Sequence, residues 1–347
     1  MRLPIESGLG SDPQPNLHDL IREAPERETG KFFWQRYEDL CATVFYDRQQ
    51  LDWPWTARIV EHEGVLSAVQ ERTLIPQFIE ICLLAGLGQG RAKTVLARLG
   101  QNIKQLDEDL IGVWCIGQRE QEGQKTPILN VNLEPRLWYL LAKQQVGYSV
   151  PASVDLLARH YRLAYPNDTG ALWYDSLDEI NGDEPAFLAS FDPSDQLLAT
   201  YLTAQWDPDQ ARHLWQSAKK QFEWDRGRSL WRLRDDSFSD DVADESLVSY
   251  QTETQLLEVL VRQTLAGYDE AWEHYQILKS SLFHFYDAER GWWRQSVQKD
   301  ERPLPQYGSA EQLLALLLEH RFSQHGFGDH PFTNQNLRDE PPLVLKY

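Results

Sequence analysis

Three acidic residues stand at matching points of the chain and are the first candidates for catalytic groups. Asp195, Glu253 and Glu311 each precede, by one or two residues, a Gln-Leu-Leu sequence that opens an apolar stretch. Two carboxyl groups about 5 Å apart, or about 6.5 to 9.5 Å apart, can cleave a glycosidic bond as acid and nucleophile or as acid and base. An acid in the first turn of a helix also caps free amides and complements the helix dipole. Both interpretations stay open for these residues.

A second set of candidates is aromatic and basic. Flat aromatic faces stack against the apolar faces of sugar rings, and an arginine can pair with a carboxylate or phosphate of a ligand. For the tryptophans the alternative is a structural role, in which they pack one repeat on the next. The residues predicted to bind substrate are Trp55, Trp114, Trp173, Trp231, Trp293, Tyr250, Tyr307, Arg136 and Arg232.

Histidine and metal chemistry have few candidates in this sequence. His62 lies in a loop from which it can reach a central cavity, so it joins the candidate catalytic residues, with an ordinary loop role as the alternative. Segment 235–245 holds six acids, which favours a calcium-binding loop or a solvated one, and its spacing matches no known calcium motif. Spacings such as HExxH or CxxC do not occur, so we predict no metal and no cofactor.

The elements that must position these residues repeat along the chain. Tryptophans recur at steps of 59, 59, 58 and 62 residues from Trp55 to Trp293, and an apolar helix is predicted to begin about 22 residues after each one. An amphipathic stretch precedes each tryptophan, as where Val95, Leu99 and Ile103 recur at a spacing of four. Residues 313–318 are apolar on every side and must be enclosed by other helices. Each unit is therefore predicted to be a hairpin with its first helix outside and its second inside.

A ring of such hairpins buries its inner helices together. This predicts an all-α protein, an α/α toroid (barrel) of five to six helical hairpins with outer and inner helix rings, and an open superhelix is the alternative. We assign residues 1–29 to an N-terminal segment with a short helix, 30–322 to a toroid of about five 59-residue hairpins, and 323–347 to an irregular tail packing on it. In a toroid the inner helices all start on one side, so their free amides converge on one funnel.

The repeat resembles the six-hairpin carbohydrate enzymes, and most closely the N-acylglucosamine 2-epimerase and mannose isomerase superfamily. The similarity rests on residues 171–178 followed by 195–198, and on residues 291–294 followed by 311–315. It implies a toroid that binds a sugar in its central funnel. Members of the superfamily take their acid and base from histidines on inner helices and adjoining loops. The corresponding helix heads here carry Gln77, Arg136, Asp195, Glu253 and Glu311.

Charge and composition exclude other classes. The 347 residues carry a formal net charge of −19, which repels phosphate backbones and anionic lipids, so neither nucleic acid nor a membrane is expected as a partner. The sequence contains no stretch typical of a signal peptide or a membrane span, and three widely spaced cysteines suit reduced thiols. These features predict a cytoplasmic protein.

We therefore expect a carbohydrate-active protein that binds a small sugar-like molecule, with epimerase, isomerase or glycoside hydrolase chemistry. The first alternative is a non-catalytic toroid that holds a protein partner or a ligand. The second is an isoprenoid cyclase or transferase, for which the funnel would have to be apolar.

Overall fold

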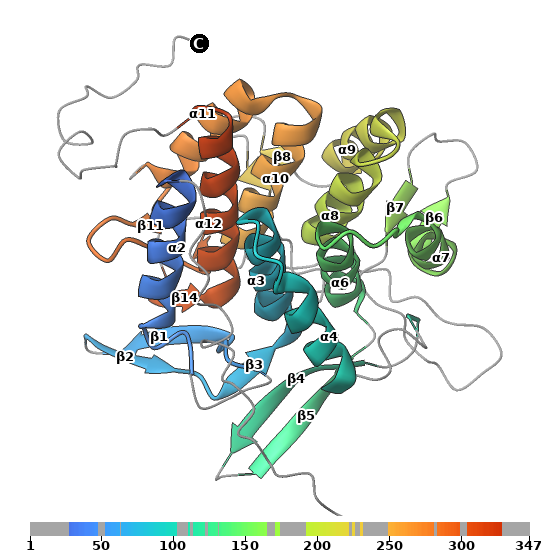
Figure 1. The fold of residues 1–347 in the computed structure, drawn as a ribbon. Coiled ribbons are helices and arrows are strands. Elements are labelled where there is room, and N and C mark those ends of the chain that lie inside the picture. The colour runs from blue at the N-terminus through green and yellow to red at the C-terminus, as the bar shows by residue number, and fades with distance from the viewer. Residues whose placement is uncertain are drawn as a thin grey trace, which may run out of the picture.

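The part of the chain that the structure describes is predominantly helical. The computed structural model describes residues 28–47, 53–62, 64–102, 110–111, 114–121, 124–130, 132–164, 171–173, 192–221, 224–225, 230–231, 249–280, 283–298 and 304–327. Ten helices and fourteen short strands lie in these ranges (Figure 1). Within them, no helix combines the length and the apolar character needed to cross a membrane.

Five helices, called the inner helices below, contact one another in a circuit. They are α3 (Leu74–Gly86), α6 (Leu133–Gln145), α8 (Pro193–Ala204), α10 (Thr252–Leu265) and α12 (Ser309–Gln324). Each contacts the next along the chain, and α12 contacts α3. Every residue of α8 is buried, and so are residues 313–318 of α12. The prediction that this apolar stretch is enclosed by other helices is confirmed.

The other five helices lie outside this circuit. They are α2 (Glu28–Cys41), α4 (Ala92–Asn102), α7 (Pro151–Tyr161), α9 (Pro208–Gln221) and α11 (Tyr268–Lys279). Helices α4, α7, α9 and α11 pack on the inner helix that precedes them, and α2 packs on α12. In α4, Val95 and Leu99 are buried whereas Lys93 is exposed, as the amphipathic pattern predicts. Ile103 lies outside the described residues.

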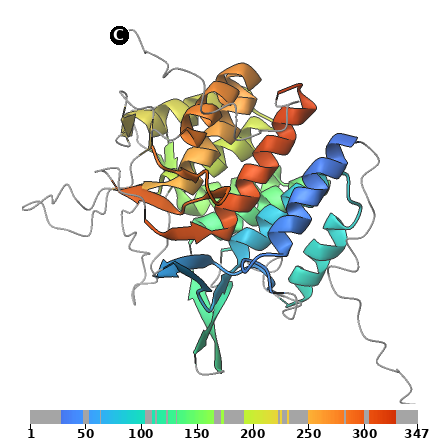
Figure 2. The same ribbon diagram turned by 90° about the vertical axis from the view of Figure 1, so that its left-hand side faces the viewer.

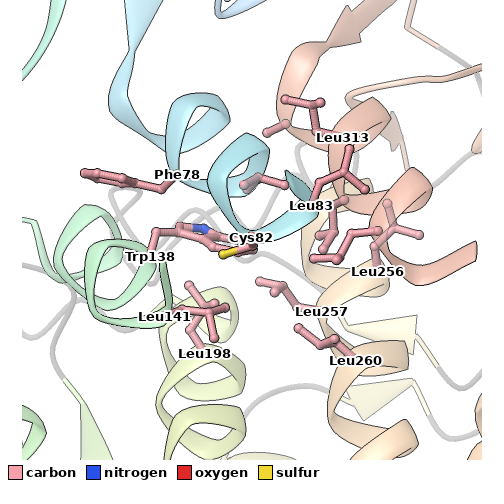
Figure 3. Close-up of a cluster of buried hydrophobic side chains, with 14 of the residues drawn as sticks. Phe78, Cys82, Leu83, Trp138, Leu141, Leu198, Leu256, Leu257, Leu260 and Leu313 are labelled. Carbon is pink, nitrogen blue, oxygen red and sulfur yellow. The ribbon is translucent and has the colours of Figure 1, made fainter. Parts of the chain in front are cut away.

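Apolar side chains from all five inner helices fill the middle of the circuit. Figure 3 shows this apolar centre, with Phe78 and Cys82 of α3, Trp138 and Leu141 of α6, Leu198 of α8, Leu256, Leu257 and Leu260 of α10, and Leu313 of α12. All of these side chains are at most 1% exposed. Their removal from water stabilises the packing of the inner helices.

The segments between outer and inner helices form short strands, which corrects the all-α expectation. They are β1 (Arg58–His62), β2 (Val65–Ala68), β3 (Glu71–Thr73), β4 (Trp114–Gln121), β5 (Gln124–Asn130), β6 (Arg162–Ala164), β7 (Ala171–Trp173), β8 (Trp224–Asp225), β9 (Leu230–Trp231), β10 (Ser249–Gln251), β11 (Tyr286–Asp287), β12 (Trp292–Trp293), β13 (Ser296–Gln298) and β14 (Gln306–Gly308). Two sheets have three strands, in the orders β14-β1-β2 and β3-β4-β5, and the others have two. The β4–β5 hairpin extends away from the helices (Figure 2).

Glycines occupy the turns between consecutive helical pairs. Gly88, Gly147 and Gly267 have φ values of 74°, 91° and 113°, a left-handed backbone that side chains other than glycine's disfavour. Each of these glycines lies between an inner helix and the outer helix that follows it. They end one inner helix so that the next outer helix can begin.

Glutamine side chains hold the repeated tryptophans and explain the constant spacing. The Gln255 amide accepts the N–H of Trp231 at 2.9 Å and donates to its carbonyl oxygen at 2.8 Å. The same paired bonds join Gln196 to Trp173 and Gln312 to Trp293, and Gln77 donates to the Trp55 carbonyl oxygen. The side-chain amide thus satisfies backbone groups that no strand reaches.

We expect Gln255→Leu to lower the free energy of unfolding by about 3 kcal/mol, because the N–H and C=O of buried Trp231 both lose their partner. Urea denaturation at neutral pH measures this. Gln205→Leu is the control, because the Gln205 side chain is exposed and bonds only one carbonyl. Equal small losses in both variants would contradict the structural role of Gln255.

Helix α2 is held on α3 by a buried acid whose ionisation depends on pH near neutrality. The Tyr37 hydroxyl donates to Glu80 Oε1, and Glu80 is 1% exposed. Burial raises the pKa of Glu80 to about 7. The folded state therefore keeps this proton over a pH range in which the unfolded chain releases it.

The stability that this proton contributes is complete below the ordinary pKa of the carboxyl and is lost as pH rises through 7. Glu80→Gln does not titrate. Relative to the parent protein, it should therefore gain about 3 kcal/mol between pH 4.5 and pH 8. Urea denaturation at both pH values tests this, and parallel pH profiles of the two proteins would contradict it.

Candidate functional site

Carboxyl groups gather at the N-terminal ends of the inner helices. Glu134, Glu253 and Glu311 lie in the first turns of α6, α10 and α12. Asp192, the N-cap of α8, raises the pKa of both Glu134 and Glu253, and its Oδ1 accepts the Ser194 N–H at 2.7 Å. These four acids are called the carboxyl cluster below.

Within the cluster, Glu134 and Glu253 are hydrogen-bonded to each other and form what we call the carboxyl dyad. Burial raises the pKa of Glu253 to about 8, and the charge of Glu311 adds to the rise. Burial, followed by the charges of Glu253 and Asp192, raises the pKa of Glu134 well above its ordinary value. Two carboxyl groups in contact do not both ionise readily. The dyad therefore holds a proton at neutral pH.

Trp138 joins the dyad to the apolar centre. Its indole Nε1–H donates to Glu253 Oε1 at 3.2 Å and also hydrogen-bonds Glu134. The side chain is fully buried in the apolar centre, which also contains Phe78 and Cys82 (Figure 3). The dyad therefore has a hydrogen-bond donor on the side that faces the apolar centre.

Both acids of the dyad are partly exposed to solvent. Glu134 precedes Arg136 by two residues, and Glu253 precedes Gln255 by two residues. In α3, Ile75 has the corresponding position, two residues before Gln77. All three are half-buried, whereas the residues directly before and after each of them are buried. Ser194 Oγ of α8 lies 2.7 Å from Thr254 Oγ1 of α10, and both residues are buried. A small molecule approaching the N-terminal ends of α6 and α10 therefore meets Glu134 and Glu253 before these hydroxyls.

The Glu311 side chain folds back over the start of its own helix. It hydrogen-bonds its own backbone N–H, and a Cβ added at Gly308, the N-cap, would overlap its carboxylate. Burial raises the pKa of Glu311 to about 8. This contact agrees with the capping interpretation of a first-turn acid. A catalytic role for Glu311 stays a prediction.

Asp195 and Arg136 are buried in the same layer of the inner helices. Asp195 is 1% exposed on α8. The Arg136 Nε donates to the Leu110 carbonyl oxygen at 2.8 Å, and its guanidinium lies 4.8 Å from the Trp114 ring centroid. Arg136 thus occupies on α6 the position that a glutamine occupies on each of the other four inner helices. Roles of Asp195 and Arg136 toward a ligand stay predictions.

The predicted aromatic residues are packed inside the protein. The five repeated tryptophans are at most 3% exposed, and so are the two tyrosines; they are Trp55, Trp114, Trp173, Trp231, Trp293, Tyr250 and Tyr307. The Trp55 ring contacts Tyr46 with 4.9 Å between centroids, and the Tyr307 hydroxyl donates to Asp287 Oδ2 at 2.8 Å. These contacts account for structural roles, and stacking on a ligand stays a prediction.

The remaining sequence candidates lie away from the dyad or outside the description. His62 is exposed at the end of β1, where it pairs with Val65 across the hairpin. Arg232 and segment 235–245 lie outside the described residues. Among the residues that are described, no three His, Cys, Asp or Glu side chains are placed to hold a metal ion.

Sequence reasoning missed Glu134, Asp192 and Trp138. The signal for Glu134 was present, because it precedes Arg136 by two residues just as Glu253 precedes Gln255. Aligning the repeats on the glutamine position would have found it. Nothing in the sequence pattern distinguishes Trp138 from an ordinary core residue.

Comparisons with known proteins include a distant structural neighbour. No family model matches this chain, and no curated protein matches it. A crystal structure of a D-mannose isomerase is similar with a TM-score of 0.45 and 13% identity, over 83% of this chain and 97% of the other.

Proposed function

We propose that this protein binds a sugar at the carboxyl cluster and transfers protons on it, as a sugar isomerase or epimerase. The proposal includes a complete α/α toroid whose inner helices direct their N-terminal ends toward one sugar-binding funnel. The observation that carries it is the hydrogen-bonded dyad of Glu134 and Glu253, half-buried at those ends.

Isomerisation or epimerisation of a sugar begins with removal of a proton from the carbon next to the carbonyl group. In the singly ionised dyad, the carboxylate accepts this proton while the neutral carboxyl donates its own to the carbonyl oxygen. The sugar becomes an enediol, and the dyad again holds one proton. Reversal of the two transfers at the neighbouring carbon gives the isomer, and reversal at the opposite face gives the epimer. The positive N-terminal ends of α6, α8 and α10 favour the electron-rich intermediate.

The separation of the two carboxyl groups favours proton transfer over glycoside hydrolysis. Carboxyl groups that hydrogen-bond each other are closer than the roughly 5 Å of a retaining pair or the wider gap of an inverting pair. The raised pKa values supply a neutral acid close to its base near neutral pH. Of the candidate catalytic residues found in the sequence, Glu253 takes part directly in this step. Glu311 contributes by raising the pKa of Glu253.

A hydroxyl-rich ligand suits the groups around the dyad. Sugar hydroxyls both donate and accept, so they can hydrogen-bond the carboxyl groups of Glu134, Glu253 and Asp192. Free amides in the first turns of the inner helices add donors for sugar oxygens. The repeated tryptophans are kept as proposed stacking surfaces.

A thermal-shift panel of aldoses, ketoses, N-acyl sugars and sugar acids tests the proposal. We expect one sugar class to raise Tm and to be interconverted with its isomer or epimer. Because the dyad must lose one proton to act as a base, turnover should rise with pH through about 8. Stabilisation by prenyl diphosphates alone, or by a sugar without turnover, would contradict the proposed activity.

A further inference from the structure

We infer that Trp138 is the positioning residue of the carboxyl dyad: its single indole N–H fixes the inner oxygens of Glu134 and Glu253 and leaves the shared proton on the side that a ligand can reach. A catalytic role for Trp138 rests on the proposed function. The position of the dyad's proton does not depend on that function.

The contacts of Trp138 give it this place. The indole Nε1–H lies 3.2 Å from Glu253 Oε1 and also hydrogen-bonds Glu134, so one donor serves both acids. The ring is fully buried in the apolar centre, to which Phe78 and Cys82 of α3 also belong (Figure 3). Packing on all sides fixes the direction of the N–H bond, as positioning of a reactive group requires.

An indole nitrogen only donates, so its hydrogen bond favours a carboxyl oxygen that carries no proton. We therefore expect the proton of the dyad on the oxygens that Trp138 does not contact. Both acids are half-buried, so the dyad has partial access to solvent. Burial is the larger effect and raises the pKa of each acid. The hydrogen bond from Trp138 favours the ionised form and therefore lowers the pKa.

The charged groups that act on this pair come from two further acids at the starts of inner helices. Asp192 of α8 raises the pKa of both acids, and Glu311 of α12 raises the pKa of Glu253. Among the described residues that perturb the dyad, Trp138 alone provides a hydrogen bond from outside the carboxyl cluster. Removal of the Trp138 donor should therefore raise the pH midpoint at which the dyad titrates.

Trp138→Phe keeps an aromatic ring and removes the donor. Carbon-13 NMR titration of the side-chain carboxyls should show the dyad midpoint raised by about one pH unit relative to the parent protein. Trp215→Phe is the matched control, because the Trp215 indole donates to Glu258 Oε2 at 2.9 Å, away from the carboxyl cluster. Its dyad midpoint should equal that of the parent. An unshifted midpoint in folded Trp138→Phe would overturn the inference.

A second measurement uses the unaltered protein and remains available if Trp138→Phe does not fold. With nitrogen-15 in the indole rings, one N–H resonance should shift with the dyad midpoint, and that shift should disappear in Glu253→Gln. Absence of any indole resonance that follows the dyad would overturn the inference. Neither titration needs a substrate, so failure of the sugar panel and failure of this inference are distinguishable.

With a substrate in hand, Trp138→Phe should lower kcat more than it changes KM and should move the pH–rate profile to higher pH.

Discussion

Glu253→Gln is expected to lower kcat for the sugar substrate by about 10²- to 10⁴-fold, the range over which a positioned acid or base acts. Glutamine keeps the size of the side chain and can still accept from the Trp138 indole, but it cannot carry the transferred proton. Glu134→Gln should have an effect of similar size. Because the two acids act as one unit, the double variant should lose little more than either single variant. Steady-state kinetics at pH 8 measure all three.

Asp209→Asn is the control for these variants, since it removes an acid whose side chain is 89% exposed and paired with Arg212 on an outer helix. It should turn over at the parental rate. Turnover of Glu253→Gln within about threefold of the parent would remove the dyad from the mechanism. Fully additive losses in the double variant would indicate that the acids work in separate steps.

Glu319→Gln is expected to destabilise the protein by about 3 to 5 kcal/mol, the usual effect of removing one partner from a buried ion pair. Glu319 of α12 accepts from the Tyr275 hydroxyl at 2.8 Å and from Lys279 Nζ at 2.7 Å, and it also pairs with Arg36 of α2. Lys279 and Glu319 are both buried. Neutral glutamine would remove the anion that lies 2.7 Å from the buried Lys279 ammonium.

The pH dependence of this effect has a definite sign. The neighbouring cations, Lys279 first, lower the pKa of Glu319 to about 2 despite its burial. Its contribution is therefore present above the ordinary carboxyl pKa and is lost as pH falls toward 2. Urea denaturation should show a large difference between Glu319→Gln and the parent at pH 7 that shrinks below pH 4.5. Glu270→Gln, at a half-exposed pair with Arg262, should lose less than about 1 kcal/mol. Losses of equal size in the two variants would contradict the role of burial.

The helical repeat was predictable because it depends on local pattern. Two predicted features correspond to features of the structure, namely the steps between tryptophans and the apolar stretch 313–318. The Gln255 amide shows why the spacing is constant, since it must reach the backbone of Trp231 from the first turn of the next helix. Spacing alone could not show that this contact is to the backbone.

The short strands and the pairing of Glu134 with Glu253 could not be predicted from local sequence pattern. Strands such as β8 and β9 have two residues each, too short for an alternating pattern to emerge. Glu134 and Glu253 are far apart in the chain, and only the packing of α6, α8 and α10 brings them together. The sequence placed Glu311 beside Glu253 through the repeat, but it could not show that the Glu311 carboxylate turns back toward Gly308.

Deuterium incorporation from D₂O is the most direct test of proton transfer by the dyad. The dyad is half-exposed and exchanges its proton with solvent, so the sugar that the panel identifies should gain deuterium at the carbon next to its carbonyl group as it is interconverted. NMR of the sugar measures this, and the incorporation should disappear in Glu253→Gln. Interconversion in which the original carbon-bound hydrogen is fully retained, or incorporation that continues unchanged in Glu253→Gln, would contradict the assignment of Glu134 and Glu253 as the acid and base.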